Sequence, residues 1–459
     1  MTGVPATWGF TTTGDVVFEA AHNCLQQGAS WCGAAPLARV GDPVIPEDVA
    51  RHVRELGPLE SPVIWWTFAG WSVALLAVAV FFRHRRRIGR RAGIAALVCF
   101  LLAAVTGVNT YVGYVRTAHD LGRLLQRASG PIAAMGRLLD DGRNGPEEGS
   151  GPRQVHDRGG DRPDDLHIEQ VELPDPPHAI PSGHTFVLLP PGYAQPENAQ
   201  RRYPVVYLIH GYPYGGPEDW LTSGDAPTTL RMLYADHAIA PAIVVSVDMT
   251  AGQPSRDWEC LNVPGGPQLE SYLAQTVVPT IDQRYRTVAD RGERALGGMS
   301  GGGYCALNIG LHHVDQFGSL LIALPYDTLG DDQDLLHGDR NLIEANTPHD
   351  YLPTMPFAHP VAVMLAVGTG APTDVDTAKT IAAAFEARGQ EAVVHIEHGF
   401  NHTWHTARAA LPSLLMFADQ RFTPPAAGPS AGPPPTAGPG GPVPPPPGRP
   451  SRGHHRDRP

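Results

Sequence analysis

Hydrophobic residues occur in two kinds of stretch: two long uninterrupted runs near the start of the chain, and many short runs further on. From Leu166 to about Phe422, short apolar runs typical of buried strands alternate with stretches of helical spacing. This alternation predicts an α/β fold in which helices cover both faces of a mostly parallel sheet. The strand-like runs are Thr185–Leu189, Val205–Ile209, Ile243–Val247, Arg294–Leu296, Leu320–Ala323, Val361–Val367 and Val393–Ile396.

The two long runs each have the length of a membrane span. Val63–Phe82 is uncharged and Ala92–Val115 is slightly longer, and a helix needs roughly 20 apolar residues to cross a bilayer. Six arginines lie in the loop between them, at residues 83–91. Because short arginine-rich loops stay in the cytoplasm, we predict a transmembrane hairpin over residues 61–116. The alternative is a buried helical hairpin of a soluble protein, which the arginines disfavour.

The hairpin divides the chain into segments with different expected roles. With its loop in the cytoplasm, residues 1–60 form an exported segment and everything after residue 116 is extracytoplasmic. We expect no cleaved signal peptide, because the first 60 residues lack an apolar core. Residues 117–165 should form an amphipathic helix and a linker, and residues 166–422 a compact domain. Residues 423–459 are mostly Pro, Gly and Ala, which predicts a disordered tail, either a spacer or inert.

Charge and cysteine content narrow the possible functions. The 459-residue chain has a formal net charge of −12, which argues against nucleic acid as a partner. Its five cysteines include no C-x-x-C pair, so we expect no metal site of that kind. Cys24 and Cys32 can pair as a disulfide if their segment is exported. Cys99 falls inside the second apolar run and should act as a small apolar residue.

A serine lies in a Gly-rich turn between a strand-like and a helix-like run. Ser300 is the centre of Gly298-Met299-Ser300-Gly301-Gly302 and precedes the helix-like Tyr304–Ile309. This is the G-x-S-x-G nucleophile elbow in its required strand–turn–helix context. The glycines permit strained backbone angles and leave room for substrate. We therefore predict that Ser300 is a nucleophile for acyl chemistry through a covalent ester.

The serine needs a histidine as its base, and in α/β-hydrolases that histidine comes near the end of the chain. The late histidines are His395, His398, His402 and His405. His395 lies within a strand-like run and His398 immediately after it. His402 lies in a turn before the last helix-like stretch, where it can reach the edge of the sheet. We predict His402 as the base, with His405 as the next candidate or else a solvent-facing helix residue.

The acid that orients the histidine should follow the strand-like run Val361–Val367. Asp374 and Asp376 both lie in the segment after it. Asp376 directly precedes a helix-like stretch and is suited to be its N-cap. If Asp376 caps that helix, Asp374 is free to contact the imidazole. We therefore prefer Asp374 and keep Asp376 as the alternative.

An oxyanion hole should lie after the strand-like run Val205–Ile209, which ends in His210-Gly211-Tyr212. In α/β-hydrolases one backbone N–H comes from this loop and one from the residue after the nucleophile. We predict the N–H groups of Tyr212 and Gly301 as the donors, each worth roughly 3 kcal/mol in the transition state. Candidates for lining the cleft are Asp219, Trp220, Arg231, Asp257 and Trp258.

Two of the remaining cysteines are candidates for a disulfide beside this site. Cys305 lies on the helix-like stretch after Ser300, and Cys260 lies in the segment that follows Asp257 and Trp258. Disulfides persist in oxidising compartments outside the cytoplasm. Because the domain is expected to be extracytoplasmic, we hypothesise a Cys260–Cys305 disulfide.

Several motifs resemble one known family. Arg202–Gly211 resembles the oxyanion strand of the Putative esterase family of α/β-hydrolases. That family includes enterochelin esterases, S-formylglutathione hydrolases of the esterase D type, feruloyl esterases and mycobacterial mycolyltransferases. Tyr272–Arg286, His312–Gly318 and His402–Trp404 are similar to further motifs in the same order. The resemblance covers about residues 180–415 and implies the α/β-hydrolase fold with a Ser-Asp/Glu-His triad. Where the family often has Met after the nucleophile, this chain has Gly301.

Three functions are compatible with these observations. The first is a membrane-anchored, extracytoplasmic serine esterase that acts on carboxylic esters without a cofactor or metal. The second, implied by the resemblance to mycolyltransferases, is an acyltransferase that moves an acyl group to a sugar or lipid alcohol. The third is a non-catalytic module with a hydrolase fold. The expected partners are an ester or acyl-lipid substrate and the bilayer, and the oligomeric state is left open.

Overall fold

The computed structural model of the protein describes residues 41–118, 120–122, 153–154 and 165–422. The predicted tail, residues 423–459, lies outside the described residues. The same holds for the proposed Cys24–Cys32 pair and for most of the predicted helix and linker at residues 117–165.

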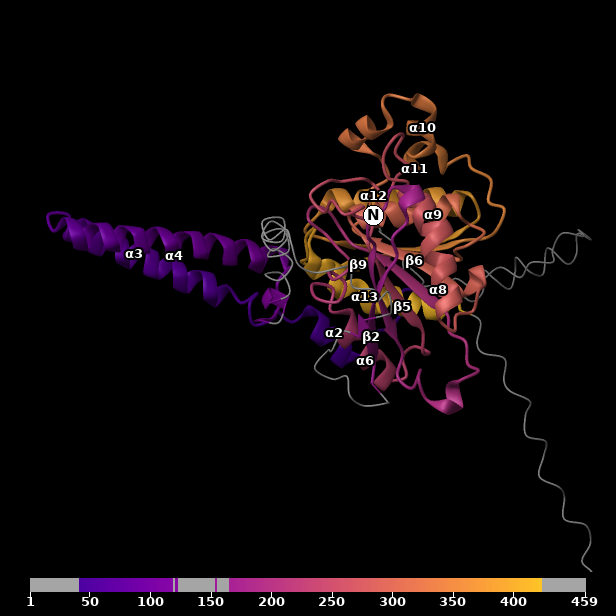
Figure 1. Ribbon diagram of the computed structural model, residues 1–459, viewed down its shortest axis with the longest axis horizontal. Helices are drawn as coiled ribbons and strands as arrows, with labels where there is room; N and C mark the ends of the chain where they lie inside the picture. Colours follow the sequence, from indigo (N-terminus) through magenta and orange to yellow (C-terminus); the bar gives the residue numbers. More distant parts are fainter. Residues whose placement is uncertain (1–40, 119, 123–152, 155–164, 423–459) are drawn as a thin grey trace, which may run out of the picture. The chain divides into compact units, whose positions relative to one another are not determined.

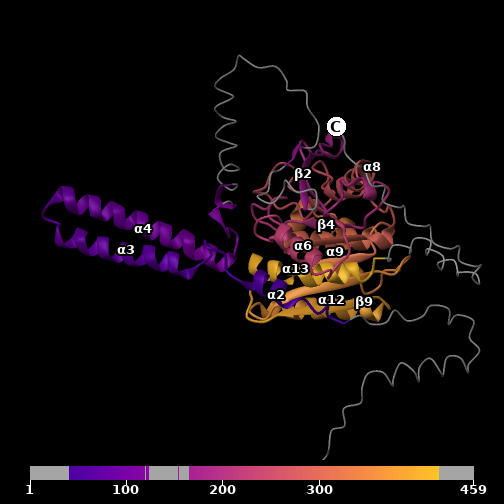
Figure 2. The same cartoon turned by 90° about the horizontal axis from the view of Figure 1, so that it is seen from below.

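The two long apolar runs form a pair of helices. Helix α3 (Pro62–Phe81) and helix α4 (Arg86–Val112) lie side by side (Figures 1 and 2). The Ser72 hydroxyl donates to the Ala96 carbonyl oxygen at 2.9 Å across the pair. Helix α4 ends at Val112 and is capped by Gly113, whose φ of 71° is the left-handed conformation typical of a helix C-cap. Both helices are long and apolar enough to cross a membrane, and they are almost entirely unburied, unlike core helices of a soluble domain.

A nine-stranded sheet forms the centre of the domain, and its strand order is β1-β2-β3-β5-β4-β6-β7-β8-β9. Strands β1 to β3 pair antiparallel, as do β3 and β5, and the other pairs are parallel. The prediction of a mostly parallel sheet is therefore confirmed. The strands are β1 (Arg153–Gln154), β2 (His167–Glu172), β3 (His184–Leu189), β4 (Val205–Ile209), β5 (Ile243–Val247), β6 (Arg294–Met299), β7 (Ser319–Ala323), β8 (Ala362–Gly368) and β9 (Glu391–Glu397).

Helices cover both faces of the sheet (Figure 1), as expected for the α/β-hydrolase fold. The remaining helices are α2 (Glu47–Arg54), α6 (Ala226–Ala235), α7 (Leu269–Ser271), a π-helical turn (Tyr272–Val277), α8 (Val278–Arg284), α9 (Gly301–His312), α10 (Arg340–Ala345), α11 (Pro348–Tyr351), α12 (Pro372–Ala387) and α13 (Trp404–Asp419). Short 3₁₀ helices occur at Pro176–His178, Pro196–Asn198, Arg291–Glu293 and Gly330–Leu336.

Two apolar cores lie on the two faces of the sheet. In β4, Val205, Tyr207 and Ile209 belong to one core, and Val206 and Leu208 belong to the other, because successive side chains of a strand point to opposite faces. The first core contains residues of α8, α9 and α12. The second contains residues of α2, α6 and α13. Such double coverage explains why the strands lack a polar alternation in the sequence.

The segment before the hairpin is part of this domain, which the sequence did not predict. Val49 and Val53 of α2 are fully buried in the second core. Glu60 accepts two hydrogen bonds from Arg408 of α13, both at 3.0 Å, and neither side chain is exposed. A buried, bidentate pair of this kind is costly to break. The chain that precedes the hairpin is thereby fixed to the domain that follows it.

Candidate active site

Ser300 lies in the turn between β6 and α9. Its φ of 55° and ψ of −118° are strained for a residue with a side chain. Its N–H donates to the Ala323 carbonyl oxygen at 2.9 Å, which holds the turn against the neighbouring strand β7. Glycine is required nearby, because a Cβ on Gly302 would collide with the carbonyl oxygens of Ile209 and His210. The turn therefore has the geometry of a nucleophile elbow.

His402 and Asp374 lie next to this serine. The His402 Nε2 is 2.8 Å from the Ser300 Oγ, and its Nδ1 is 2.6 Å from the Asp374 Oδ2. A carboxylate only accepts, so the proton of a neutral imidazole sits on Nδ1 and Nε2 faces the hydroxyl as acceptor. This is the tautomer that can take a proton from a serine.

Asp376 is not part of this arrangement. Helix α12 begins at Pro372 with Ala371 as its N-cap, so the prediction that Asp376 caps the helix was wrong. The fixed φ of proline favours it at the first helical position, and the helix starts five residues earlier than expected. Asp374 and Asp376 then lie two residues apart on one helix and point in different directions. Asp376 is exposed, whereas Asp374 faces His402.

The other late histidines have different surroundings. His395 in β9 is buried between Asp42 and Glu397, and His398 is exposed. His405 is not the solvent-facing residue that we considered. Its Nδ1 accepts from Arg408 at 2.9 Å, and its Nε2 donates to the Thr110 carbonyl oxygen of α4 at 3.1 Å.

The proposed oxyanion donors lie close together. A Cβ built on Gly301 would be 3.7 Å from the Tyr212 nitrogen. Among the described residues, neither backbone N–H has an acceptor, so both can bind an oxygen that is developing negative charge. His210 stabilises the loop: its Nε2 accepts from the Met249 N–H at 3.2 Å, and its Nδ1 donates to the Gly211 carbonyl oxygen at 3.1 Å.

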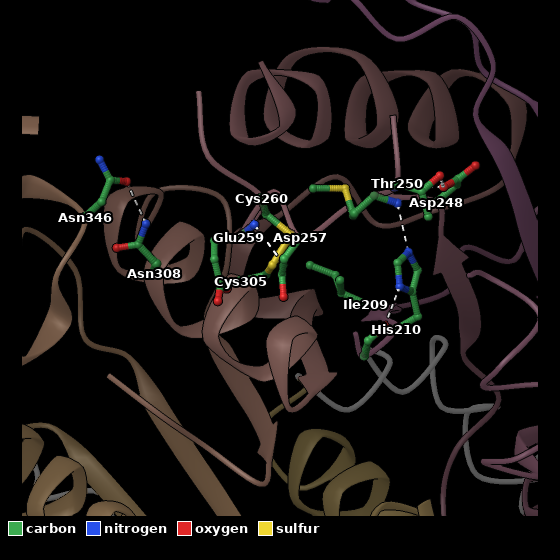
Figure 3. Close-up of a disulfide and its surroundings, with 12 residues drawn as sticks. Ile209, His210, Asp248, Thr250, Asp257, Glu259, Cys260, Cys305, Asn308 and Asn346 are labelled. Atoms are coloured by element: carbon green, nitrogen blue, oxygen red, sulfur yellow. Dashed lines mark hydrogen bonds between the residues drawn. A yellow bond between two sulfur atoms is a disulfide. The ribbon is translucent and has the colours of Figure 1, made fainter. Parts of the chain in front are cut away.

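The hypothesised disulfide is present. Cys260 and Cys305 are joined, with an S–S distance of 2.00 Å, and Figure 3 shows the bridge beside Asp257 and Glu259. It links the loop that precedes α7 to helix α9, whose first residue is Gly301. The disulfide therefore braces the helix that begins at the candidate oxyanion hole.

Glu259 is a buried carboxyl next to this bridge. Burial, with a further contribution from the charge of Asp257, raises the pKa of Glu259 to about 9. The pKa of Asp257 is raised to about 6, again mainly by burial. The Tyr326 hydroxyl contacts the Glu259 Oε1 at 2.6 Å. At neutral pH Glu259 is therefore protonated and uncharged.

A pocket of about 870 Å³ opens at Ser300 and His402. Its lining residues come from the oxyanion loop and the segment after it, the segment after β5, the elbow, the histidine turn and the end of α4. They are Val112, Tyr114, Gly211, Tyr212, Pro213, Tyr214, Asp219, Pro254, Ser255, Met299, Ser300, His402, Thr403 and Trp404. Of the residues predicted to line the cleft, Asp219 does so. Val112 and Tyr114 do as well, and no sequence signal pointed to them, because they belong to the second apolar run.

The other predicted cleft residues do not line this pocket. Trp220 is fully buried and donates to the Ile209 carbonyl oxygen at 2.9 Å. Arg231 pairs with Asp165 at 2.9 Å. Asp257 and Trp258 line a small cavity beside the disulfide, and the lining of this cavity also includes Tyr212 and Gly301. Asp257 and Trp258 therefore adjoin the candidate oxyanion hole without lining the pocket at Ser300.

Comparisons with known proteins identify relatives that match part of the chain. The chain is 34% identical over 173 residues to an uncharacterized protein of Corynebacterium glutamicum, a stretch that is 36% of this chain and 39% of that protein. It is 36% identical over 136 residues to an endo-1,4-beta-xylanase/feruloyl esterase of Xylanibacter ruminicola, or 29% of this chain and 18% of that protein. The matched stretches span less than two thirds of these relatives.

Similar solved structures include a ferulic acid esterase, at 22% identity and a TM-score of 0.48, over 56% of this chain and 99% of that one. Another is an S-formylglutathione hydrolase from Agrobacterium tumefaciens, at 14% identity and a TM-score of 0.48, over 59% of this chain and 99% of that one. The model of the family described as Putative esterase matches residues 182–413, just over half of the chain. The protein therefore belongs to the Putative esterase family.

Proposed function

We propose that this protein is a membrane-anchored serine esterase that hydrolyses carboxylic esters on the extracytoplasmic side. The observation that supports it best is the continuous contact from Asp374 through His402 to Ser300, with hydrogen bonds of 2.6 and 2.8 Å. The contact lies at the wall of a pocket large enough for a small-molecule ester.

The reaction follows from the position of each group. His402 Nε2 removes the proton of Ser300 as its Oγ attacks the ester carbonyl carbon, and Asp374 stabilises the resulting imidazolium. The N–H groups of Tyr212 and Gly301 bind the carbonyl oxygen as it becomes an oxyanion. The C–O bond to the alcohol then breaks, and His402 gives its proton to the departing alkoxide. Water, deprotonated by His402, attacks the acyl-serine, and collapse of that intermediate releases the acid and restores Ser300.

Two features support the extracytoplasmic location. The arginine-rich loop at residues 83–91 favours the cytoplasmic side for the turn of the hairpin, which leaves the domain outside. The Cys260–Cys305 disulfide fits an oxidising compartment. Proteolysis of right-side-out membrane vesicles tests this location: we expect residues 166–422 to be cleaved without lysis, and a fully protected domain would contradict it.

The activity is tested on the full-length chain in detergent with a fluorophosphonate probe and short 4-nitrophenyl esters. We expect labelling and ester hydrolysis by the native chain, and loss of both in Ser300→Ala. Labelling that persists in this variant, or its absence from the native chain, would refute the proposal. The same assay with glycerol or trehalose separates hydrolysis from transfer, because a new ester of the added alcohol appears only if an alcohol replaces water.

A further inference from the structure

Part of the active-site pocket is built by the hairpin. Val112 is the last residue of α4, and Tyr114 follows the Gly113 cap. Both line the pocket that contains Ser300 and His402, yet both lie outside the family match at residues 182–413. The end of α4 is thus part of the site in this chain.

Hydrogen bonds fix this end of α4 to the domain. The Tyr114 hydroxyl donates to the Asp219 Oδ1 at 2.8 Å, and the Ser223 hydroxyl donates to the Tyr114 carbonyl oxygen at 2.7 Å. One turn earlier, the Thr110 carbonyl oxygen accepts from His405 at 3.1 Å. Three residues of the catalytic domain therefore hold the helix end in place at the pocket.

The length of α4 places this pocket at a membrane surface if the hairpin spans the bilayer. The helix from Ala92, after the arginines, to Val112 is about 31 Å long at 1.5 Å per residue, close to the thickness of a hydrocarbon core of about 30 Å. Trp65 and Trp66, in the first turns of α3, and Tyr111 lie at the same end of the hairpin. Such aromatic residues mark the membrane–water interface.

The lining suits an uncharged, apolar group. Val112, Pro213, Pro254, Met299 and Trp404 contribute mainly apolar surface. Among the described residues that line the pocket, none is lysine or arginine. The one acidic side chain, Asp219, already accepts from Tyr114 and from the Gly216 N–H. The pocket therefore offers hydrophobic burial without a partner for an anionic headgroup.

We propose that the substrate is an uncharged lipid ester of the bilayer that holds the hairpin, and that its acyl chain packs against the end of α4 at Val112. This inference rests on the proposed function, because it requires both the serine chemistry and the membrane span. The ester passes from the outer leaflet into the pocket beside α4, and its acyl chain stays in contact with apolar surface. Each methylene buried this way is worth about 0.8 kcal/mol, roughly a fourfold gain in binding.

Acyl-chain preference tests the role of Val112. With the full-length chain, kcat/KM is measured for 4-nitrophenyl esters from acetate to palmitate. Val112→Trp shortens the pocket and should lower the dodecanoate-to-acetate ratio of kcat/KM by at least about tenfold. Val112→Ala should move the preference toward longer chains. Tyr111→Trp, at an exposed neighbouring position outside the lining, is the matched control and should keep the native ratio within about twofold.

Fluorophosphonate labelling of Ser300 in each variant verifies an intact site. If both Val112 variants are labelled and keep the native dodecanoate-to-acetate ratio of kcat/KM, contact between the acyl chain and Val112 is refuted. The esterase proposal would still stand. If the native chain is not labelled, the proposed function itself fails.

A fluorogenic diacylglycerol tests whether the ester reaches the pocket from the bilayer that holds the hairpin. The protein is placed in vesicles that contain this ester, or in plain vesicles mixed with separate ester-bearing vesicles at the same total concentration. We expect hydrolysis at least about tenfold faster when enzyme and ester share a bilayer, because the local concentration is higher. Equal rates of hydrolysis in the two arrangements would refute the entry of the ester from the enzyme's own bilayer.

Discussion

Two histidine–carboxylate pairs with similar distances have opposite consequences in this protein. His402 Nδ1 contacts Asp374 at 2.6 Å, and His395 Nδ1 contacts Asp42 at 2.7 Å. The difference lies at the second ring nitrogen: His402 Nε2 faces the Ser300 hydroxyl, whereas His395 Nε2 faces the Glu397 carboxylate at 2.9 Å.

The second partner decides whether the ring can act as a base. Two carboxylates can only accept, so both nitrogens of His395 must carry protons. Burial alone would lower the pKa of His395, but the hydrogen bonds to Asp42 and Glu397 outweigh it and raise the pKa to about 9. His395 is therefore a cation at neutral pH that links the N-terminal segment to β9, and only His402 retains a nitrogen free to accept a proton from serine.

The largest expected effect comes from removing the His402 base. His402→Gln should lower kcat/KM for a short 4-nitrophenyl ester by about 10⁴-fold or more, because no group then removes the Ser300 proton. His395→Gln, the matched variant of the other pair, should stay within about threefold. Equal losses of activity in the two variants, with both folded as judged by circular dichroism, would contradict the conclusion that only His402 acts as a base.

The next effect separates the two aspartates. Asp374→Asn should lower kcat by about 10³- to 10⁴-fold, since an amide favours the wrong tautomer of His402. Asp376→Asn should leave kcat within about twofold, because that side chain is exposed and two helix positions away. Steady-state kinetics of both variants decide this, and a larger loss in Asp376→Asn would reverse the assignment of the acid.

His395 should make stability depend on pH. Its pKa is raised from 6.5 to about 9 in the folded chain, so its contribution is fully present below about pH 6.5 and is lost as the pH rises through about 9. Thermal unfolding between pH 6 and 10 should therefore show a falling Tm, and His395→Gln should flatten this fall. If Tm falls with pH as steeply in the variant as in the native chain, the ionisation of His395 is not the cause of the pH dependence.

Glu259 differs from the carboxylates of the two histidine pairs, because its partner is the Tyr326 hydroxyl and not an imidazole. Its pKa is raised from 4.5 to about 9, first by burial and then by Asp257, so its contribution is greatest below about pH 4.5 and declines as the pH rises through about 9. Glu259→Gln keeps the shape without the charge and should reduce the loss of Tm between pH 5 and 9. If the variant loses Tm as steeply as the native chain, Glu259 is ionised at neutral pH.

Much of the candidate active site could be predicted from the sequence because it depends on short-range patterns. A buried strand is a run of apolar residues, and the elbow is a serine among glycines. Strands β4 and β5 therefore have the bounds that the apolar runs indicated, and Ser300 lies at the turn that its neighbours require. The choice of His402 also followed from local order along the chain.

The remaining features depend on packing between distant segments, and only the tertiary structure decided them. Whether Asp374 or Asp376 reaches His402 depends on where α12 starts, and the partner of His395 lies 353 positions away at Asp42. The end of α4 at the pocket depends on contacts from Tyr114 to Asp219 and Ser223. Local patterns determine which elements form, because burial and turn geometry act over a few residues, whereas contacts between segments arise only when the whole domain packs.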